Sequence, residues 1–320
     1  MKRWVGIIII FILFFGILPH VLSRYYVILL TKILIFAIFA MSLDLLVGYL
    51  KLPSLGHGAF FGIASYFIGI FSTRVGNSFW LNFPLAIATA VVLAALFGLL
   101  VLRTQGAYFF MISLALSQML WGIVFSWRFL TRGDDGIPGI VRPDLGFFPW
   151  SLQDPVCFLY FVLFFFIVAF VLMSLLVRSP FGHTILGIRE SELRMRTLGY
   201  NTWLHKYIWF ILSGLFAGLA GVLSVYLNGF VSPASLNVAV SAEALLMVLL
   251  GGAGTLIGPI IGAGSLILLE NIVSAYTERW LLILGIIFVL VRMTTPYGIL
   301  GLFGRSRAKK VPTHESVTGG

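Results

Sequence analysis

Residues 156–177 read VCFLYFVLFFFIVAFVLMSLLV, an uncharged run long enough to cross a membrane as a single helix. The hydrocarbon core of a bilayer is spanned by about 20 consecutive apolar residues in helical conformation. Lipid offers no water to the backbone, so a spanning segment must pair its own N–H and C=O groups, as a helix does. This stretch therefore predicts a membrane-spanning helix.

Similar runs fill most of the chain, whose 320 residues are 60% hydrophobic and only 10% charged. Soluble domains carry about 25% charged residues. Ten segments are predicted to span the membrane, at residues 4–22, 27–47, 56–71, 81–102, 106–125, 156–177, 207–227, 238–250, 258–273 and 280–291. The count falls to nine or eight if the short eighth and tenth segments do not cross. The predicted fold is an all-α polytopic membrane helix bundle.

The loops divide the chain into one transmembrane domain, residues 1–304, and a polar tail, residues 305–320. Two connecting loops are long, at 127–155 and 178–206. The first is rich in Gly, Pro and Asp, which predicts turns. No small-residue cleavage site precedes Arg24, so the first apolar run is expected to stay as a helix.

Lysine and arginine are distributed unequally between the alternate loops. With ten spans and both termini in the cytoplasm, fourteen lie inside: Lys2, Arg3, Lys51, Arg103, Arg178, Arg189, Arg194, Arg196, Lys206, Arg292, Arg305, Arg307, Lys309 and Lys310. Six lie outside: Arg24, Arg74, Arg128, Arg132, Arg142 and Arg279. Cytoplasmic loops carry the excess of basic residues. The sequence therefore predicts an N-in, C-in orientation.

Several function classes are excluded by what the sequence lacks. The net charge of +10 comes from residues at span ends, and no nucleic-acid-binding motif is present. No G-x-x-x-x-G-K-[ST] phosphate loop occurs, the five histidines are scattered, and a single cysteine, Cys157, allows no intrachain disulfide. We expect no enzymatic activity, no metal and no cofactor bound by this chain.

The inner loop at 178–206 has the signals of a short amphipathic helix. Ser179 and Pro180 fit its N-cap and first position, and Gly199 fits its end. Its charges have both signs, at Arg189, Glu190, Glu192, Arg194 and Arg196. Such a helix could dock in a groove of a soluble partner or lie on lipid headgroups.

Two glycine-rich turns connect predicted spans, KLPSLGHGAFFGIASY at 51–66 and LLGGAGTLIGPIIGAG at 249–264. Dense glycine serves close helix packing, or backbone that bends inside the membrane and lines a path. A lone histidine, His57, is predicted near the cytoplasmic interface, as a hydrogen-bonded packing residue or a ligand. The candidate path or gating residues are Gly56, His57, Gly58, Tyr108, Glu243, Gly251, Gly252 and Gly254.

Four ionisable residues fall within the predicted spans: Lys32, Asp44, Glu243 and Glu270. Such residues are costly in lipid and face a cavity or the bundle interior. All four are predicted toward span ends, and Lys32 can extend to the outer surface. Proton- and sodium-coupled transporters hold acidic groups near the midplane, so this pattern weighs against a secondary transporter.

Five stretches resemble the permeases of the branched-chain amino acid ABC importers, specifically the second of their two permease types. They are LVGYLKLPSLGHGAFFGIASY, TQGAYFFMISLALSQML, LTRGDDGIPGI, SPFGHTILGIRESELRMRTLGYN and SAEALLMVLLGGAGTLIGPIIGA, which begin at residues 46, 104, 130, 179 and 241. The end, MTTPYGILGLFG, is also similar. The chain departs from the pattern at Arg194 and Met195, where relatives carry alanines, at Asp44, often asparagine, and at Arg132, usually glycine.

The resemblance implies an importer permease in the cytoplasmic membrane of a bacterium or archaeon. The implied partners are a second permease subunit, two cytoplasmic ATPases that use ATP, and a periplasmic binding protein. The inner helix would be the coupling helix, with Arg189, Glu190, Glu192, Arg194 and Gly199 as its ATPase contacts. The solute would be a branched-chain amino acid, or urea, a short amide or an aromatic acid. A secondary transporter or channel, and a membrane scaffold, are the competing classes.

Overall fold

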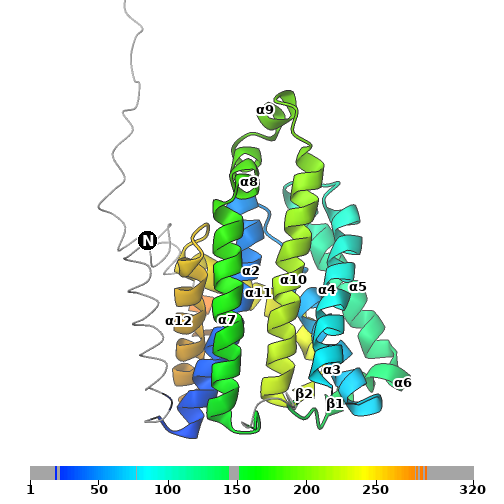
Figure 1. The fold of residues 1–320 in the computed structure, drawn as a ribbon, viewed down its shortest axis with the longest axis vertical. Helices are drawn as coiled ribbons and strands as arrows, with labels where there is room; N and C mark the ends of the chain where they lie inside the picture. The colour runs from blue at the N-terminus through cyan, green and yellow to red at the C-terminus, as the bar shows by residue number, and fades with distance from the viewer. Residues whose placement is uncertain are drawn as a thin grey trace, which may run out of the picture.

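The computed structural model describes residues 19, 22–76, 78–143, 151–277, 279, 282–283 and 285–286 (Figure 1). Its longer helices are α2 (Arg24–Leu50), α3 (His57–Arg74), α4 (Phe79–Val101), α5 (Ala107–Ser126), α7 (Pro155–Arg178), α8 (Pro180–Glu190), α10 (Thr202–Asn228), α11 (Val238–Gly251) and α12 (Ile257–Ser274). The short elements are α6 (Arg128–Thr131), α9 (Glu192–Thr197), the 3₁₀ turns η1 (Gly133–Asp135) and η2 (Pro233–Leu236), and the strands β1 (Ile137–Pro138) and β2 (Phe230–Val231).

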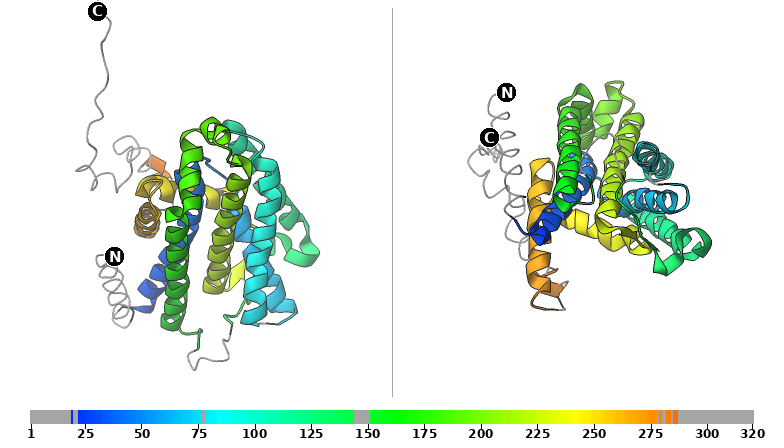
Figure 2. Two further views of the ribbon diagram at one scale, coloured as in Figure 1. Left: turned by 45° about the horizontal axis from the view of Figure 1, so that its top comes forward. Right: turned by 60° about the horizontal axis from the view of Figure 1, so that its bottom comes forward.

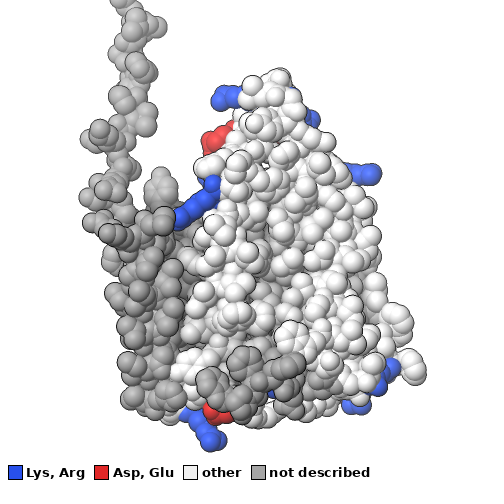
Figure 3. Space-filling model, in the orientation of Figure 1, with Lys and Arg blue, Asp and Glu red and all other residues white. Residues whose placement is uncertain are grey.

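Among the described residues, six helices are long and apolar enough to cross a membrane: α2, α4, α5, α7, α10 and α12. With α3 and α11 they account for eight of the ten predicted segments, and the polytopic helical fold is confirmed. The predicted spans 4–22 and 280–291 lie almost wholly outside the described residues, as does the tail 305–320. Figure 3 shows charged side chains gathered toward the two ends of the molecule, with an uncharged surface between them.

Helix α10 lies at the centre and packs against α2, α3 and α4. Small residues allow these close approaches. A Cβ placed on Gly214 or Gly218 would overlap Ala94 or Ala90 of α4, and one on Gly221 would overlap a backbone carbonyl of α3. The core is therefore built on small-residue contacts, which membrane helix interfaces favour.

Helix α3 begins inside the bundle rather than at its edge. His57 is fully buried, with Nε2 3.1 Å from Ser213 Oγ, and Ser213 donates to Ser42 O at 2.6 Å. Ser42 and Ser213 lie well inside α2 and α10. Because Ser213 uses its proton on Ser42, the His57 bond needs the Nε2–H tautomer. The prediction of His57 near the cytoplasmic interface is wrong, because residues 51–56 fold back into the bundle.

Helix α11 also begins inside the bundle, beside the start of α3. Ser241 Oγ accepts the Gly58 N–H at 2.7 Å, and Leu236 of η2 packs against Gly62. The 14 residues of α11 are about 21 Å long, shorter than the roughly 30 Å hydrocarbon core. This supports the alternative in which segment 238–250 does not cross by itself. Figure 2 shows α12 (orange) beside α2 (blue), and α11 (yellow) packs against both of them.

The loop at 127–155, which the predicted orientation places outside and which we call the outer loop, contains more regular structure than its turn-rich sequence predicts. The two-residue strand β1 pairs antiparallel with β2, with Ile137 opposite Val231. Ile140 N–H donates to Gly229 O at 3.0 Å, and Arg142 Nε donates to Tyr226 O at 3.1 Å. The loop is thus fastened to the end of α10. It lies at the opposite end of the molecule from α8 and α9 (Figure 1).

Candidate functional site

The inner loop forms two helices rather than the single helix predicted to run to Gly199. Ser179 caps α8 by accepting the Gly182 N–H at 3.2 Å, as the sequence predicts. Ser191 then adopts an extended conformation, with φ −159°, and its hydroxyl accepts the Arg194 N–H at 3.3 Å to cap α9. Serine competes in this way with helical hydrogen bonding. The pair α8–α9 projects beyond the rest of the bundle (Figure 1).

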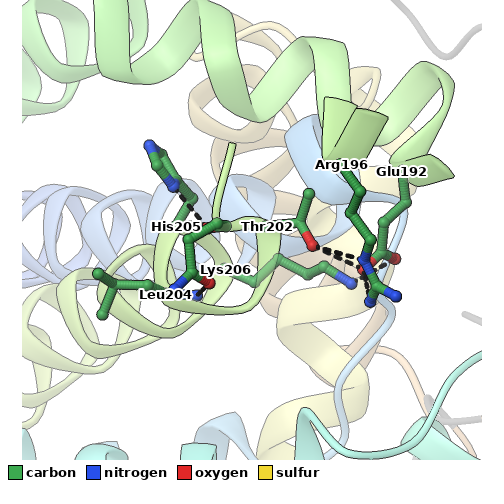
Figure 4. Close-up of polar contacts among 7 residues, drawn as sticks. Glu192, Arg196, Thr202, Leu204, His205 and Lys206 are labelled. Atoms are coloured by element: carbon green, nitrogen blue, oxygen red, sulfur yellow. Dashed lines mark hydrogen bonds and ion pairs between the residues drawn. The ribbon is translucent and has the colours of Figure 1, made fainter. Parts of the chain in front are cut away.

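A cluster of charges fastens α9 to the first turn of α10 (Figure 4). Lys206 Nζ lies 2.6 Å from Glu192 Oε2. Glu192 Oε1 accepts from Arg196 Nη2 at 2.7 Å and from Thr202 Oγ1 at 3.1 Å. Burial alone raises the pKa of Glu192, but the bonds and charge of Lys206, with Thr202 and Arg196, outweigh it, so the pKa lies below its ordinary value. We call this cluster the α9–α10 clamp.

The Glu192→Gln variant is expected to loosen the clamp and destabilise this end by about 1–2 kcal/mol, because Lys206 loses its ionic partner. Since the pKa of Glu192 is depressed in the folded chain, its contribution is present above the ordinary carboxyl pKa and is lost as pH falls through the lowered pKa. Hydrogen exchange of the α9 amides measures the effect. Glu190→Gln is the matched control, because Glu190 is 68% exposed. Equal exchange in both variants would contradict the clamp.

The predicted coupling residues divide between inward and outward positions. Glu192 belongs to the clamp and Arg189 reaches into the bundle, whereas Arg194 and Gly199 are exposed. Sequence reasoning missed the apolar side chains at the tip, Leu193 and Leu198, which are 74% and 66% exposed. The sequence feature that could have revealed them is the presence of two leucines within an otherwise polar loop. The tip therefore presents apolar side chains beside the exposed charge of Arg194.

Arg189 connects α8 to the interior. Its Nη1 donates to Gly48 O in α2 at 2.9 Å. Nearby, the Gly254 N–H donates to Asp44 Oδ1 at 2.8 Å, and Asp44 is fully buried. Gly254 has φ +84°, and a Cβ on Gly48 would overlap its backbone. The inner loop, α2 and the α11–α12 turn thus meet at one point, which we call the Arg189–Asp44 junction.

The candidate path residues fall into two groups. Gly56, His57 and Gly58 gather where α3 begins, and Gly251, Gly252 and Gly254 gather where α11 ends. Glu243 lies between them along α11, and Tyr108 lies apart, 72% exposed on the first turn of α5. Within the described part of the chain, no three His, Cys, Asp or Glu side chains could hold a metal ion.

The α8–α9 pair, the loop at 127–155 and the Arg189–Asp44 junction all lie within a segment that matches known proteins. Residues 25–292 match the family model described as branched-chain amino acid transport system / permease component. The chain belongs to this family. The family resemblance found in the sequence is therefore confirmed, and with it a multi-pass transport permease.

Individual members of this permease family show the same likeness. The chain is 31% identical over 303 residues to the high-affinity branched-chain amino acid transport system permease protein LivM of Salmonella typhimurium, and equally to that of Escherichia coli. Each alignment covers 88% of this chain and 71% of the relative. A probable LivM of Methanocaldococcus jannaschii is 24% identical over 291 residues, covering 79% of this chain and 83% of that protein. No solved structure matches the chain.

Proposed function

We propose that this permease is one membrane subunit of an ABC importer in the cytoplasmic membrane. It works with a second permease subunit, two cytoplasmic ATPases and a periplasmic binding protein. The complex imports a branched-chain amino acid or a related small polar solute. The observation that carries this proposal is the projecting α8–α9 tip, where Leu193 and Leu198 are exposed while Glu192 fastens the tip to α10.

The contacts of the α8–α9 tip suggest how a closing movement of the ATPases would be transmitted to the membrane-spanning helices. An ATPase groove would take the apolar side chains of α9, and the clamp would pass its movement to α10. Arg189 would pass movement of α8 to Gly48 and the α11–α12 turn. The chain itself would bind no ATP, so the purified single chain should hydrolyse none.

Docking can be tested with the Leu193→Asp and Leu198→Asp pair of substitutions. A carboxylate in a desolvated apolar contact is unfavourable, so we expect about tenfold less ATPase co-purification or more, with normal membrane levels of the permease. Phe129→Asp is the matched control, since Phe129 is 82% exposed at the other end. Wild-type co-purification and uptake in the tip variant would refute docking. Transport by the purified chain without any ATPase would favour a secondary transporter or channel instead.

The proposed N-in, C-in orientation places α8–α9 in the cytoplasm and η1 outside. Asp135 and Thr197 are exposed at these two ends. In a variant without Cys157, cysteines at these positions should react with a membrane-impermeant maleimide differently in intact cells. We expect Asp135→Cys to be labelled directly and Thr197→Cys only after the membrane is opened. The reverse pattern would invert the topology, and labelling of both in intact cells would refute it.

A further inference from the structure

An ion pair joins α2 to α12 in the outer half of the bundle. Lys32 Nζ lies 3.4 Å from both Oε1 and Oε2 of Glu270. Glu243 of α11 interacts electrostatically with both residues. Lys32 follows Arg24 by eight residues, about 12 Å along the helix axis. Lys32 is therefore engaged with α12, rather than extended alone to the outer surface as the sequence predicted.

A cavity of about 310 Å³ opens beside this pair. Lys32 lies in its lining, and its apolar wall includes Ile35, Phe36, Phe61 and Val240. Small-molecule sites have volumes of roughly 300–1,000 Å³ and combine apolar walls with a few polar groups. The cavity has both features, with Ser224 and Asn228 as further polar groups.

A second cavity, of about 220 Å³, continues on the other side of Lys32. It shares Lys32, Leu227 and Asn228 with the first, and Glu270 and Asn271 line it. The two cavities are therefore adjacent, with Lys32 in the lining of both and Glu270 in the lining of the second.

The pair is not shielded by the chain itself, because 39% of the Lys32 side chain and 26% of the Glu270 side chain are exposed. Charged side chains in membrane helices face the bundle interior or a water-filled cavity, since exposure to lipid is costly. This face therefore opens toward water. In the proposed importer, which this inference takes as its basis, such a face borders the translocation path.

We propose that Lys32 and Glu270 form a binding site for the zwitterionic head group of an α-amino acid on this path. Lys32 takes the α-carboxylate and Glu270, supported by Glu243, takes the α-ammonium. The incoming zwitterion replaces the Lys32–Glu270 ion pair with two ion pairs, so neither Lys32 nor Glu270 is left without a partner. An aliphatic side chain then lies against Ile35, Phe36 and Val240. Urea or a short amide carries no charges to replace the pair, so the site selects amino acids among the solutes of the family.

The test measures ligand binding to the complete complex, both permeases and both ATPases, in nanodiscs without the binding protein. The probes are L-leucine, its carboxylate analogue 4-methylpentanoate and its amine analogue 3-methylbutan-1-amine. Binding is read from the ligand-induced rise in unfolding temperature. Lys32→Met should weaken leucine and 4-methylpentanoate by about tenfold or more and should not weaken the amine, because Glu270 is then free to bind it. Glu270→Gln should weaken leucine and the amine and should not weaken 4-methylpentanoate, because Lys32 is then free to bind it.

The Lys32→Met/Glu270→Gln double variant removes both charges without leaving either unpaired, so it tests the site even if a single variant folds poorly. It should fold and lose the leucine response. Lys51→Met is the matched control, since Lys51 pairs with Glu190 at 3.8 Å outside both cavities. A wild-type leucine response in the double variant would overturn the proposal and leave the pair as a link between α2 and α12.

Uptake by the wild-type complex with its binding protein separates this proposal from the proposed function. If the wild type imports leucine and every variant binds it normally, the importer stands and only the Lys32–Glu270 site fails. If the wild type neither imports nor binds leucine or its analogues, an amino acid substrate is refuted for both.

Discussion

Gly262→Ala is expected to separate α11 from α12 and to destabilise the permease by about 3 kcal/mol or more. A Cβ on Gly262 would overlap the carbonyl oxygen of Met247 in α11. The neighbour is backbone, which cannot change rotamer, so one helix must move. The movement would also disturb the α11–α12 turn, where Gly254 meets Asp44. Thermal unfolding of the purified chain and its level in membranes measure the loss.

Gly264→Ala is the matched control on the same helix. Its Cβ would meet Ile33 Cγ2 at 3.8 Å, an ordinary van der Waals contact. Alanine is favoured over glycine in a helix by about 1 kcal/mol, so this variant should be neutral or slightly more stable. If both variants unfold alike, the close approach of α11 and α12 is not what requires glycine at 262.

Arg189→Met is expected to destabilise the chain by about 1–3 kcal/mol and to abolish coupled transport. The substitution removes the hydrogen bond to Gly48 O and the cation that interacts with buried Asp44. Asp44 keeps the Gly254 N–H as its direct partner, so the lost cation removes a longer-range interaction in addition to the hydrogen bond. The expected signature is a lower unfolding temperature together with ATP hydrolysis that no longer drives uptake.

A double-mutant cycle with Asp44→Asn separates the two causes. Asparagine can still accept the Gly254 N–H but carries no charge. In the Asp44→Asn background, Arg189→Met should cost only the bond to Gly48, about 1 kcal/mol. A loss of equal size in both backgrounds would show that the charge of Asp44 plays no part at the junction.

The sequence predicts those parts of the fold that follow from hydrophobicity alone. The long apolar runs at 27–47, 81–102, 156–177 and 207–227 correspond to the helices α2, α4, α7 and α10. The depth of α3 and α11 could not be predicted, because it depends on tertiary hydrogen bonds such as those of His57 with Ser213 and of Gly58 with Ser241. A chain that turns back inside the membrane has the same hydropathy as one that turns at its surface.

In the candidate sites, too, the sequence predicts local features but not those that depend on tertiary contacts. Capping chemistry correctly placed the start of α8 at Ser179 and Pro180, but Ser191 could cap a helix or lie within one, and only the packing of α9 decides. The sequence marked Arg189 and Glu192 by their charge, yet could not show that both turn inward. Their partners, Gly48 and Lys206, are distant in sequence or belong to another helix. The junction and the clamp depend on such contacts, which periodicity does not reveal.

Helix α10 is fastened at both of its ends. The outer loop is bonded to it at Tyr226 and Gly229, and the clamp holds it at Lys206. Its 27 residues extend about 40 Å. In the proposed importer, solute delivery by the binding protein outside and ATP binding by the ATPases inside would both act on α10. The two binding events would then be reciprocally linked. If delivered solute changes the affinity of the ATPases for ATP by some factor, ATP must change the affinity of the complex for that solute by the same factor.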